Sequence, residues 1–185
     1  METLLFALGA GIGLAALGTA LGRRYAAKLP ASASVVGVVG ASLLDTLHPD
    51  AKTFALDVFA KALDTGVATS IKVLSTRRLC ATQNALYAQG RTAPGPVVTH
   101  ARGCQSWHVA GRAVDFMPTP ATETTYRQIG DIAKSLGGAW GGDFKVRDKV
   151  TGEWKAFPDL GHIEYHPGLT ISDVCPDPDK CDDHA

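Results

Sequence analysis

The sequence predicts an α+β domain with a small, mostly antiparallel sheet, flanking helices and an apolar helical segment before it. One supporting observation is that some segments repeat apolar residues at helical spacing, whereas others are short strand-like apolar runs. Another is that the two kinds of segment follow one another in mixed order, as in α+β folds. The length of 185 residues suits one such domain with an appendage.

Each element is expected from its local pattern. A helix begins near Pro49, because Phe54, Val58 and Phe59 recur near helical spacing behind a proline that favours a helix start. Glycines end two of the later helices. The remaining elements, in order, are a strand at 71–74, a helix at 82–89, a strand at 113–116, a helix at 126–136 and a strand at 163–166.

The chain divides into an apolar segment with a linker at 1–45, a domain at 46–170 and a cysteine-containing tail at 171–185. The uncharged run Thr3–Gly22 is long enough to cross a bilayer, and its basic residues follow it, unlike those of a cleaved signal peptide. A second apolar run, Val35–Leu44, would complete a hairpin that leaves the domain outside the membrane. The alternative is a glycine-rich helix packed within an assembly such as a virion.

Composition excludes some partners and leaves others open. The 18 basic and 18 acidic residues balance, so we expect no nucleic-acid partner and no general attraction to anionic lipid.

The four cysteines lack the close pairs of a structural zinc motif. In an oxidising compartment Cys175 and Cys181 would close a small disulfide loop, and Cys80 could pair with Cys104; reduced thiols are the alternative.

Two short stretches carry the candidate chemistry. The first, Ser106–Phe116, contains His108 and Asp115, and the second, Asp159–His166, contains Asp159 and His162. A catalytic zinc has three protein ligands and an open position for water. We expect His108, Asp115 and His162 to be the zinc ligands, and Asp159 to handle the proton of the water.

Local patterns agree with this assignment. Gly111 allows a tight backbone path after His108. An acid within the apolar strand at 113–116 is costly to bury unless it is paired or bound to a metal. Asp159 precedes Gly161 in a turn and can approach the water rather than the metal. Glu164 and His166 share strand parity with His162, so both are candidates to support the ligands from behind, and His166 also to contact substrate.

These residues belong to a longer ordered pattern. Ser-x-His-x-x-Gly-x-Ala-x-Asp followed by Asp-x-x-His resembles the zinc peptidases of the D-alanyl-D-alanine carboxypeptidase and L-alanyl-D-glutamate endopeptidase family, which includes wall-remodelling enzymes and phage endolysins. The resemblance covers about residues 55 to 168. Its blocks occur in family order: Ser75–Arg78, Gln83–Thr92, Pro94–Thr99, Ser106–Asp115, Trp140–Phe144 and Asp159–His162.

The resemblance implies specific roles. Zinc would bind His108, Asp115 and His162, with Asp159 as the catalytic base. Arg78 matches the arginine that binds a substrate carboxylate or steadies the reacting carbonyl, and Arg77 takes this place if the register differs by one. Three further residues would contact substrate: Ser106, Gln83 and Trp140, the last as a pocket wall. The chain departs from the family in a longer insertion at 145–157, which affects the substrate groove.

The substrate implied by the resemblance is the peptide stem of peptidoglycan. An L-alanyl-D-glutamate endopeptidase of phage or prophage type is favoured by the block from Gln83 to Thr99, with a D-alanyl-D-alanine carboxypeptidase as the alternative. A virion or wall-binding protein that keeps zinc only for structure is a third interpretation. The expected location is the periplasm or the wall side of the membrane, or a phage virion, with membrane or virion association through residues 3–44.

Overall fold

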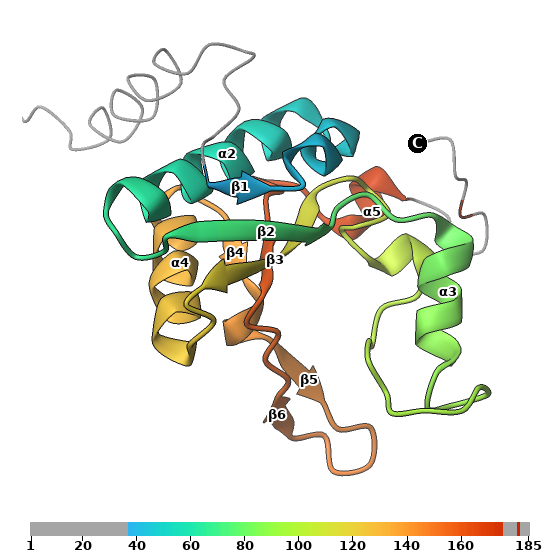
Figure 1. Ribbon diagram of the computed structural model, residues 1–185. Helices are drawn as coiled ribbons and strands as arrows, with labels where there is room; N and C mark the ends of the chain where they lie inside the picture. Colours follow the sequence, from blue (N-terminus) through green and yellow to red (C-terminus); the bar gives the residue numbers. More distant parts are fainter. Residues whose placement is uncertain (1–36, 176–180, 182–185) are drawn as a thin grey trace, which may run out of the picture. The chain divides into compact units, whose positions relative to one another are not determined.

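The computed structural model describes residues 37–175 and Cys181; the run Thr3–Gly22 and the linker after it lie outside this part (Figure 1). Five strands form one sheet in the order β1-β2-β3-β7-β4, in which only the β1–β2 pair is parallel. This confirms the α+β class and the mostly antiparallel sheet. The strands are β1 (Val38–Val39), β2 (Ser70–Ser75), β3 (Ala113–Thr119), β7 (His162–Glu164) and β4 (Ala139–Trp140).

Two amphipathic helices provide most of the helical core. Helix α2 (Pro49–Asp64) has proline in its first turn, and α4 (Glu123–Ser135) is capped by Thr122, whose side chain accepts a hydrogen bond from the Thr125 amide. Both contribute fully buried side chains to a core shared with β2, β3 and β7. Phe59 of α2 meets Phe116 of β3 with ring centroids 5.5 Å apart. Burying each such ring stabilises the fold by about 1.5–3 kcal/mol.

The alternation of β3 separates this core from the opposite face of the sheet. Val114 and Phe116 are 2% and 1% exposed and belong to the helical core. Asp115 lies between them in the strand, so its side chain points to the other face. On β7 the core residue is Ile163, which pairs with Val114, and its neighbours point the same way as Asp115. The candidate ligands of the strands therefore lie on the face that the helices leave open.

The second apolar run belongs to the folded domain, so the expected membrane hairpin is wrong. Val38 and Val39 pair with β2, and the 3₁₀ helix η2 (Ala41–Thr46) buries Leu44 to 1% exposure in the core. The sheet therefore begins within the range we assigned to the N-terminal segment. Among residues 37–175, no helix combines the length and the apolar character needed to cross a bilayer.

Trp140 is a core residue, which corrects its assignment as a pocket wall. The side chain is 2% exposed, and its Nε1 donates to the Leu160 carbonyl oxygen at 2.9 Å. Its ring lies against Gly130 and Gly142, where a Cβ atom would overlap it. The tryptophan therefore needs two glycines to fit, and it does not line the cavity described below.

The insertion at 145–157 forms a separate two-stranded hairpin. Strands β5 (Lys145–Arg147) and β6 (Trp154–Ala156) pair with each other and not with the main sheet, from which they extend away (Figure 1). Asp148 organises the turn by accepting hydrogen bonds from the amides of Val150 and Thr151 and pairing with Lys155. Trp154 is 67% exposed, so the hairpin contributes little to the core.

The cysteine pairing differs from the expectation. Cys80 pairs with Cys181, and Cys104 with Cys175, so neither bridge closes a local loop. The Cα atoms of the two pairs are 5.9 and 5.5 Å apart. The bridges join the tail, including α5 (Ile171–Val174), to α3 (Cys80–Ala88) and to the 3₁₀ helix η3 (Gly103–Gln105). Sequence spacing alone gave no information on this long-range contact.

Candidate active site

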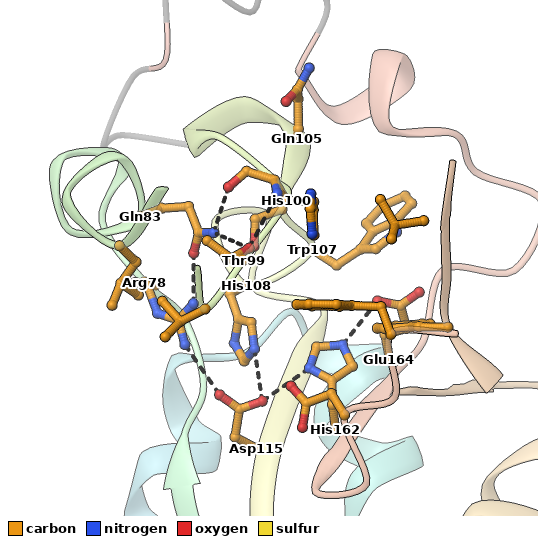
Figure 2. Close-up of a pocket in the computed structure, with 18 of the residues that line it drawn as sticks. Arg78, Gln83, Thr99, His100, Gln105, Trp107, His108, Asp115, His162 and Glu164 are labelled. Atoms are coloured by element: carbon orange, nitrogen blue, oxygen red, sulfur yellow. Dashed lines mark hydrogen bonds and ion pairs between the residues drawn. The ribbon is translucent and has the colours of Figure 1, made fainter. Parts of the chain in front are cut away.

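The three expected ligands meet on the open face of the sheet. Asp115 and His162 are direct partners in the β3–β7 ladder, and Asp115 Oδ1 lies 3.0 Å from His162 Nδ1. The same oxygen lies 3.0 Å from His108 Nε2. One ligand atom from each residue lies within 4.8 Å of the others, and Figure 2 shows both rings directed at the carboxylate. Residues 54 positions apart are thus brought to one point, as expected.

The loop that carries His108 is fixed by its backbone. Gly111 has a φ of +66°, which favours glycine, and its carbonyl oxygen accepts a hydrogen bond from the His48 amide. The His108 carbonyl oxygen accepts from the Arg78 amide at 3.0 Å. This contact joins the His108 loop to the segment after β2, so the third ligand is held beside the sheet although it is not part of it.

The hydrogen bonds of the two rings suit a bound cation. His108 Nδ1 donates to the Thr76 carbonyl oxygen at 2.6 Å, so a neutral ring directs the lone pair of Nε2 at Asp115. His162 Nε2 lies 3.1 Å from Glu164, which leaves the lone pair of Nδ1 facing Asp115 as well. Lone pairs and a carboxylate repel one another unless a proton or a metal lies between them. Two imidazole nitrogens and a carboxylate oxygen are a common zinc ligand set.

In the protein without a bound metal, protons lie between the two ring nitrogens and the Asp115 carboxylate. Burial alone would lower the pKa of His162, but its hydrogen bonds with Asp115 and Glu164 raise it to about 9. Burial alone would raise the pKa of Asp115, but hydrogen bonds from His108 and His162 hold it well below its usual range. At neutral pH the metal-free site therefore pairs an imidazolium with an ionised carboxylate, and a metal has to displace a proton.

Arg78 lies beside Asp115 and is held by several contacts. One of its terminal nitrogens lies 3.2 Å from Asp115 Oδ2 and 3.0 Å from Ser75 Oγ, and the other donates to Gln83 Oε1 at 2.6 Å. Gln83 is 1% exposed, and its amide nitrogen donates to the Ala101 carbonyl oxygen at 2.9 Å. The structure therefore places Gln83 behind Arg78, and the Gln83 amide is hydrogen-bonded to Arg78 and to the Ala101 backbone (Figure 2).

A cavity of about 410 Å³ opens onto these groups. Ser106 lines it beside His108, and Asp159 lines it from the turn before β7. Partial burial raises the pKa of Asp159, and the charge of Asp115 adds to this, although His162 and His108 oppose it. A carboxylate that lies beside the ligands and opens onto the cavity can accept a proton and return it, and a raised pKa favours the protonated form.

Comparison with known proteins identifies the family. No protein-family model matches the chain. The crystal structure of the Serratia marcescens L-Ala D-Glu endopeptidase ChiX is similar at 22% identity, with a TM-score of 0.42 over 71% of this chain and 86% of that one. Peptidoglycan L-alanyl-D-glutamate endopeptidase CwlK of Bacillus subtilis is 32% identical over 136 residues, which cover 65% of this chain and 74% of CwlK. The chain belongs to the L-alanyl-D-glutamate endopeptidase and D-alanyl-D-alanine carboxypeptidase family.

The family membership confirms the resemblance that the ordered motifs indicated.

Glu164 connects His162 to an aromatic pair, His166 and Trp107. Its carboxylate lies 3.1 Å from His162 Nε2 and 3.1 Å from His166 Nε2. His166 in turn stacks on Trp107, with ring centroids 4.0 Å apart and nearly parallel planes. Glu164 thus fixes the tautomer and orientation of His162, and His166 supports Glu164. Strand β7 ends at Glu164, so His166 acts from beyond the strand.

Sequence patterns missed several aromatic residues of this family member's cavity. Trp107, Phe144 and Phe157 line it, and His100 packs edge-on against Phe157 with ring centroids 4.6 Å apart. These residues lie in loops and at the base of the hairpin, where no periodicity identifies an inward-facing side chain. Trp107 could have been found, because it lies between Ser106 and His108 in the motif.

Proposed function

We propose that this protein is a zinc-dependent peptidoglycan hydrolase, an L-alanyl-D-glutamate endopeptidase of phage or prophage type. The observation that carries the proposal is the convergence of His108, Asp115 and His162 at the base of a cavity that also contains Asp159. The relative CwlK, which has this activity in its name, supports the choice of bond. The non-catalytic alternative is disfavoured, because a structural zinc site does not need a further carboxylate such as Asp159 beside its ligands in an open cavity.

Zinc held by these three ligands would polarise the scissile carbonyl group and lower the pKa of a water molecule. The protein's own base is Asp159, a carboxylate that lines the cavity beside the ligands and whose pKa is raised by burial. Asp159 accepts a proton as water attacks the peptide carbonyl carbon. It then returns a proton to the amine of the leaving D-glutamate residue, which completes hydrolysis of the bond.

Arg78 contributes a fixed positive charge beside the reacting group. Contacts with Gln83, Ser75 and Asp115 hold its guanidinium group in place before substrate arrives. A preorganised charge can stabilise the negative oxygen of the tetrahedral intermediate without reorganising during the reaction. We therefore assign Gln83 a positioning role toward Arg78 rather than a direct substrate contact, because its amide is fully buried and already hydrogen-bonded.

The stem peptide would lie between two walls of the cavity. One wall is the loop after α3, represented by Thr99 and His100, and the other is the base of the β5–β6 hairpin, represented by Phe144 and Lys145. Ser106 lies at the floor beside His108. A cleft with a cationic lysine and apolar rings suits a short acidic peptide with alanine side chains.

Digestion of purified peptidoglycan, with products analysed by mass spectrometry, tests the proposal. Chelator-sensitive appearance of new L-alanine carboxyl and D-glutamate amino termini is the expected result. Released D-alanine would identify a carboxypeptidase instead. Absence of any chelator-sensitive product, in a sample shown to contain zinc, would support the non-catalytic interpretation.

We further propose that the protein acts on the wall side of the cytoplasmic membrane. Its substrate is located there, and the run Thr3–Gly22 has the length and composition to associate with a membrane or a virion. Residues 38–46 belong to the peptidase domain, so this association would depend on the earlier run alone. Fractionation of producing cells and of phage particles, with a variant lacking residues 3–22 as the control, measures this location.

A further inference from the structure

The four cysteines form a cluster that the catalytic proposal does not use. Sγ atoms of Cys80, Cys104 and Cys181 all lie within 4.8 Å of one another, and Cys175 is paired with Cys104. The four residues come from three separate parts of the chain: the start of α3, η3 and the tail. In the structure these residues form two neighbouring disulfides, Cys80–Cys181 and Cys104–Cys175.

We propose that the reduced cluster binds one structural Zn²⁺ through all four cysteine thiolates, at a site separate from the His108–Asp115–His162 centre. Tetrahedral Zn²⁺ with Zn–S distances of about 2.3 Å separates its sulfur ligands by about 3.8 Å. The sulfurs of Cys80, Cys104 and Cys181 all lie within 4.8 Å of one another, and Cys80 and Cys181 are joined in a disulfide. Once that bond is reduced, small side-chain movements bring the three sulfurs to this geometry. The fourth sulfur is adjacent through its pairing with Cys104.

The surroundings favour thiolates. Cys80 is the first residue of the nine-residue helix α3, so it lies at the positive end of the helix dipole, which favours a thiolate. Arg91 and Arg102 line a surface hollow together with Cys181. A zinc ion with four thiolates has a net charge of about −2, which these two guanidinium groups would offset.

Local packing also accommodates the cluster. Cys80 and Cys104 are each 4% exposed, so a metal here would be largely shielded from water. Gly103 lies so close to the tail that a Cβ atom there would be 2.6 Å from the Cys181 sulfur. Its amide donates to Asn84 Oδ1 at 2.9 Å, which fixes the backbone beside the cluster. Glycine at this position is what allows the tail cysteine to reach the others.

The disulfide and zinc forms are related by a balanced reaction. Two molecules of a dithiol reductant supply four electrons and four protons, which convert the two disulfides to four thiols. Binding of one Zn²⁺ then forms four Zn–S bonds and releases four protons. The disulfide form suits an oxidising compartment, and the zinc form suits the reducing cytoplasm in which the chain is synthesised.

The zinc would hold the segments that position the catalytic residues. Cys80 is two residues after Arg78, and Cys104 is two residues before Ser106 and four before His108. A metal shared by these segments and the tail fixes their separation. The cluster is therefore a structural support for the cavity that forms without an oxidant.

The test measures zinc and thiols in the full-length protein purified from a reducing cytoplasm. His108→Ala, which damages the other centre, should retain one zinc per chain and four thiols. Adding Cys175→Ser and Cys181→Ser to this variant should remove that zinc, whereas adding Ser172→Ala in the exposed face of α5 should not. Replacing zinc with Co²⁺ in the His108→Ala variant should give the near-ultraviolet charge-transfer band of thiolate ligation.

The unsubstituted protein gives a second measurement that does not depend on the folding of a variant. Treatment with an oxidant should release one zinc as the four thiols are lost, and a dithiol with added zinc should reverse both changes. The proposal is overturned if reduced protein with four free thiols binds no zinc in the His108→Ala background. It is also overturned if zinc bound there gives no cysteine-dependent cobalt spectrum. Neither result bears on the hydrolase, which is measured separately on peptidoglycan.

Discussion

Asp115 faces His162 directly across the β3–β7 ladder, with Oδ1 of the acid 3.0 Å from Nδ1 of the ring. Backbone hydrogen bonds of the sheet thus set the separation of two of the three candidate ligands. His108 comes from a loop and depends on its contacts with Thr76 and Arg78. Substitutions around this centre should therefore separate into those that affect the metal, those that affect proton transfer and those that affect folding.

The stability of the metal-free protein should fall as the pH rises through the titration of His162. The pKa of this group is raised from 6.5 to about 9 in the folded protein by Asp115 and Glu164, against the effect of burial. Because the folded state binds the proton more tightly, the contribution is complete below about pH 6.5 and is lost as the pH passes about 9. Urea unfolding of chelator-treated protein across this range measures the effect. An unchanged or increasing stability would contradict it, and zinc-loaded protein serves as the comparison.

Zinc binding at neutral pH should release about one proton from His162, since its raised pKa keeps the ring protonated in the metal-free protein. Calorimetric titration in buffers with different ionisation enthalpies counts this proton. Glu164→Gln should reduce the number released, because the variant loses one of the two acids that raise the pKa. Equal proton release by both proteins would show that Glu164 does not influence the ring.

Glu164→Gln should also weaken zinc affinity by about 10-fold to 100-fold, because the ligand His162 loses its ionised partner. Activity should recover substantially when zinc is added in excess, since Asp159 and Arg78 are unchanged. Competition with a chromophoric chelator measures the affinity. Glu153→Gln, in the exposed hairpin, is the matched control and should bind zinc normally. Loss of activity that excess zinc fails to restore would indicate a direct role for Glu164.

Asp159→Asn should retain zinc and lose about 10²-fold to 10⁴-fold in kcat, because the amide cannot accept the proton of the attacking water. Elemental analysis and turnover of a soluble muropeptide are the two measurements. Asp143→Asn is a suitable control, because that exposed acid pairs with Lys134 and does not line the cavity. Turnover close to that of the unsubstituted protein would remove Asp159 from the mechanism.

Gly130→Ala should destabilise the protein by about 1–3 kcal/mol, although alanine normally favours a helix interior by about 1 kcal/mol. The added methyl group would overlap the Trp140 ring, which is buried against α4. Chemical unfolding measures the change in the free energy of unfolding. Gln128→Ala, on an exposed turn of the same helix, should leave stability nearly unchanged. A gain in stability on Gly130→Ala would mean that the ring moves aside at little cost.

The sequence allowed good prediction of features that depend on local patterns. Apolar periodicity located α2 within one residue of its start, and the acid within an apolar strand identified Asp115 as a partly buried group with partners. Strand parity correctly placed Glu164 on the same face as His162. These predictions succeeded because alternation in a strand and spacing in a helix are properties of neighbouring residues.

Features that depend on long-range packing were not predictable in this way. The fit of Trp140 depends on Gly130, which comes from a different element, so its burial has no local signal. The cysteine pairs span 101 and 71 positions, and spacing favoured the nearer partners instead. Strand β1 contains only Val38 and Val39, and its identity depends on pairing with β2.

The separate pairing of β5 with β6 makes the hairpin a replaceable module. Its strands share no ladder hydrogen bonds with the five-stranded sheet, and its tip carries Val150 at 95% exposure. Shortening or exchanging the tip should leave the ligands in place, because they are positioned from the sheet and the His108 loop. Of the hairpin, only the base lines the cavity, through residues that include Phe144, Lys145 and Phe157, so changes at the tip would alter the outer surface and leave that wall of the cleft unchanged.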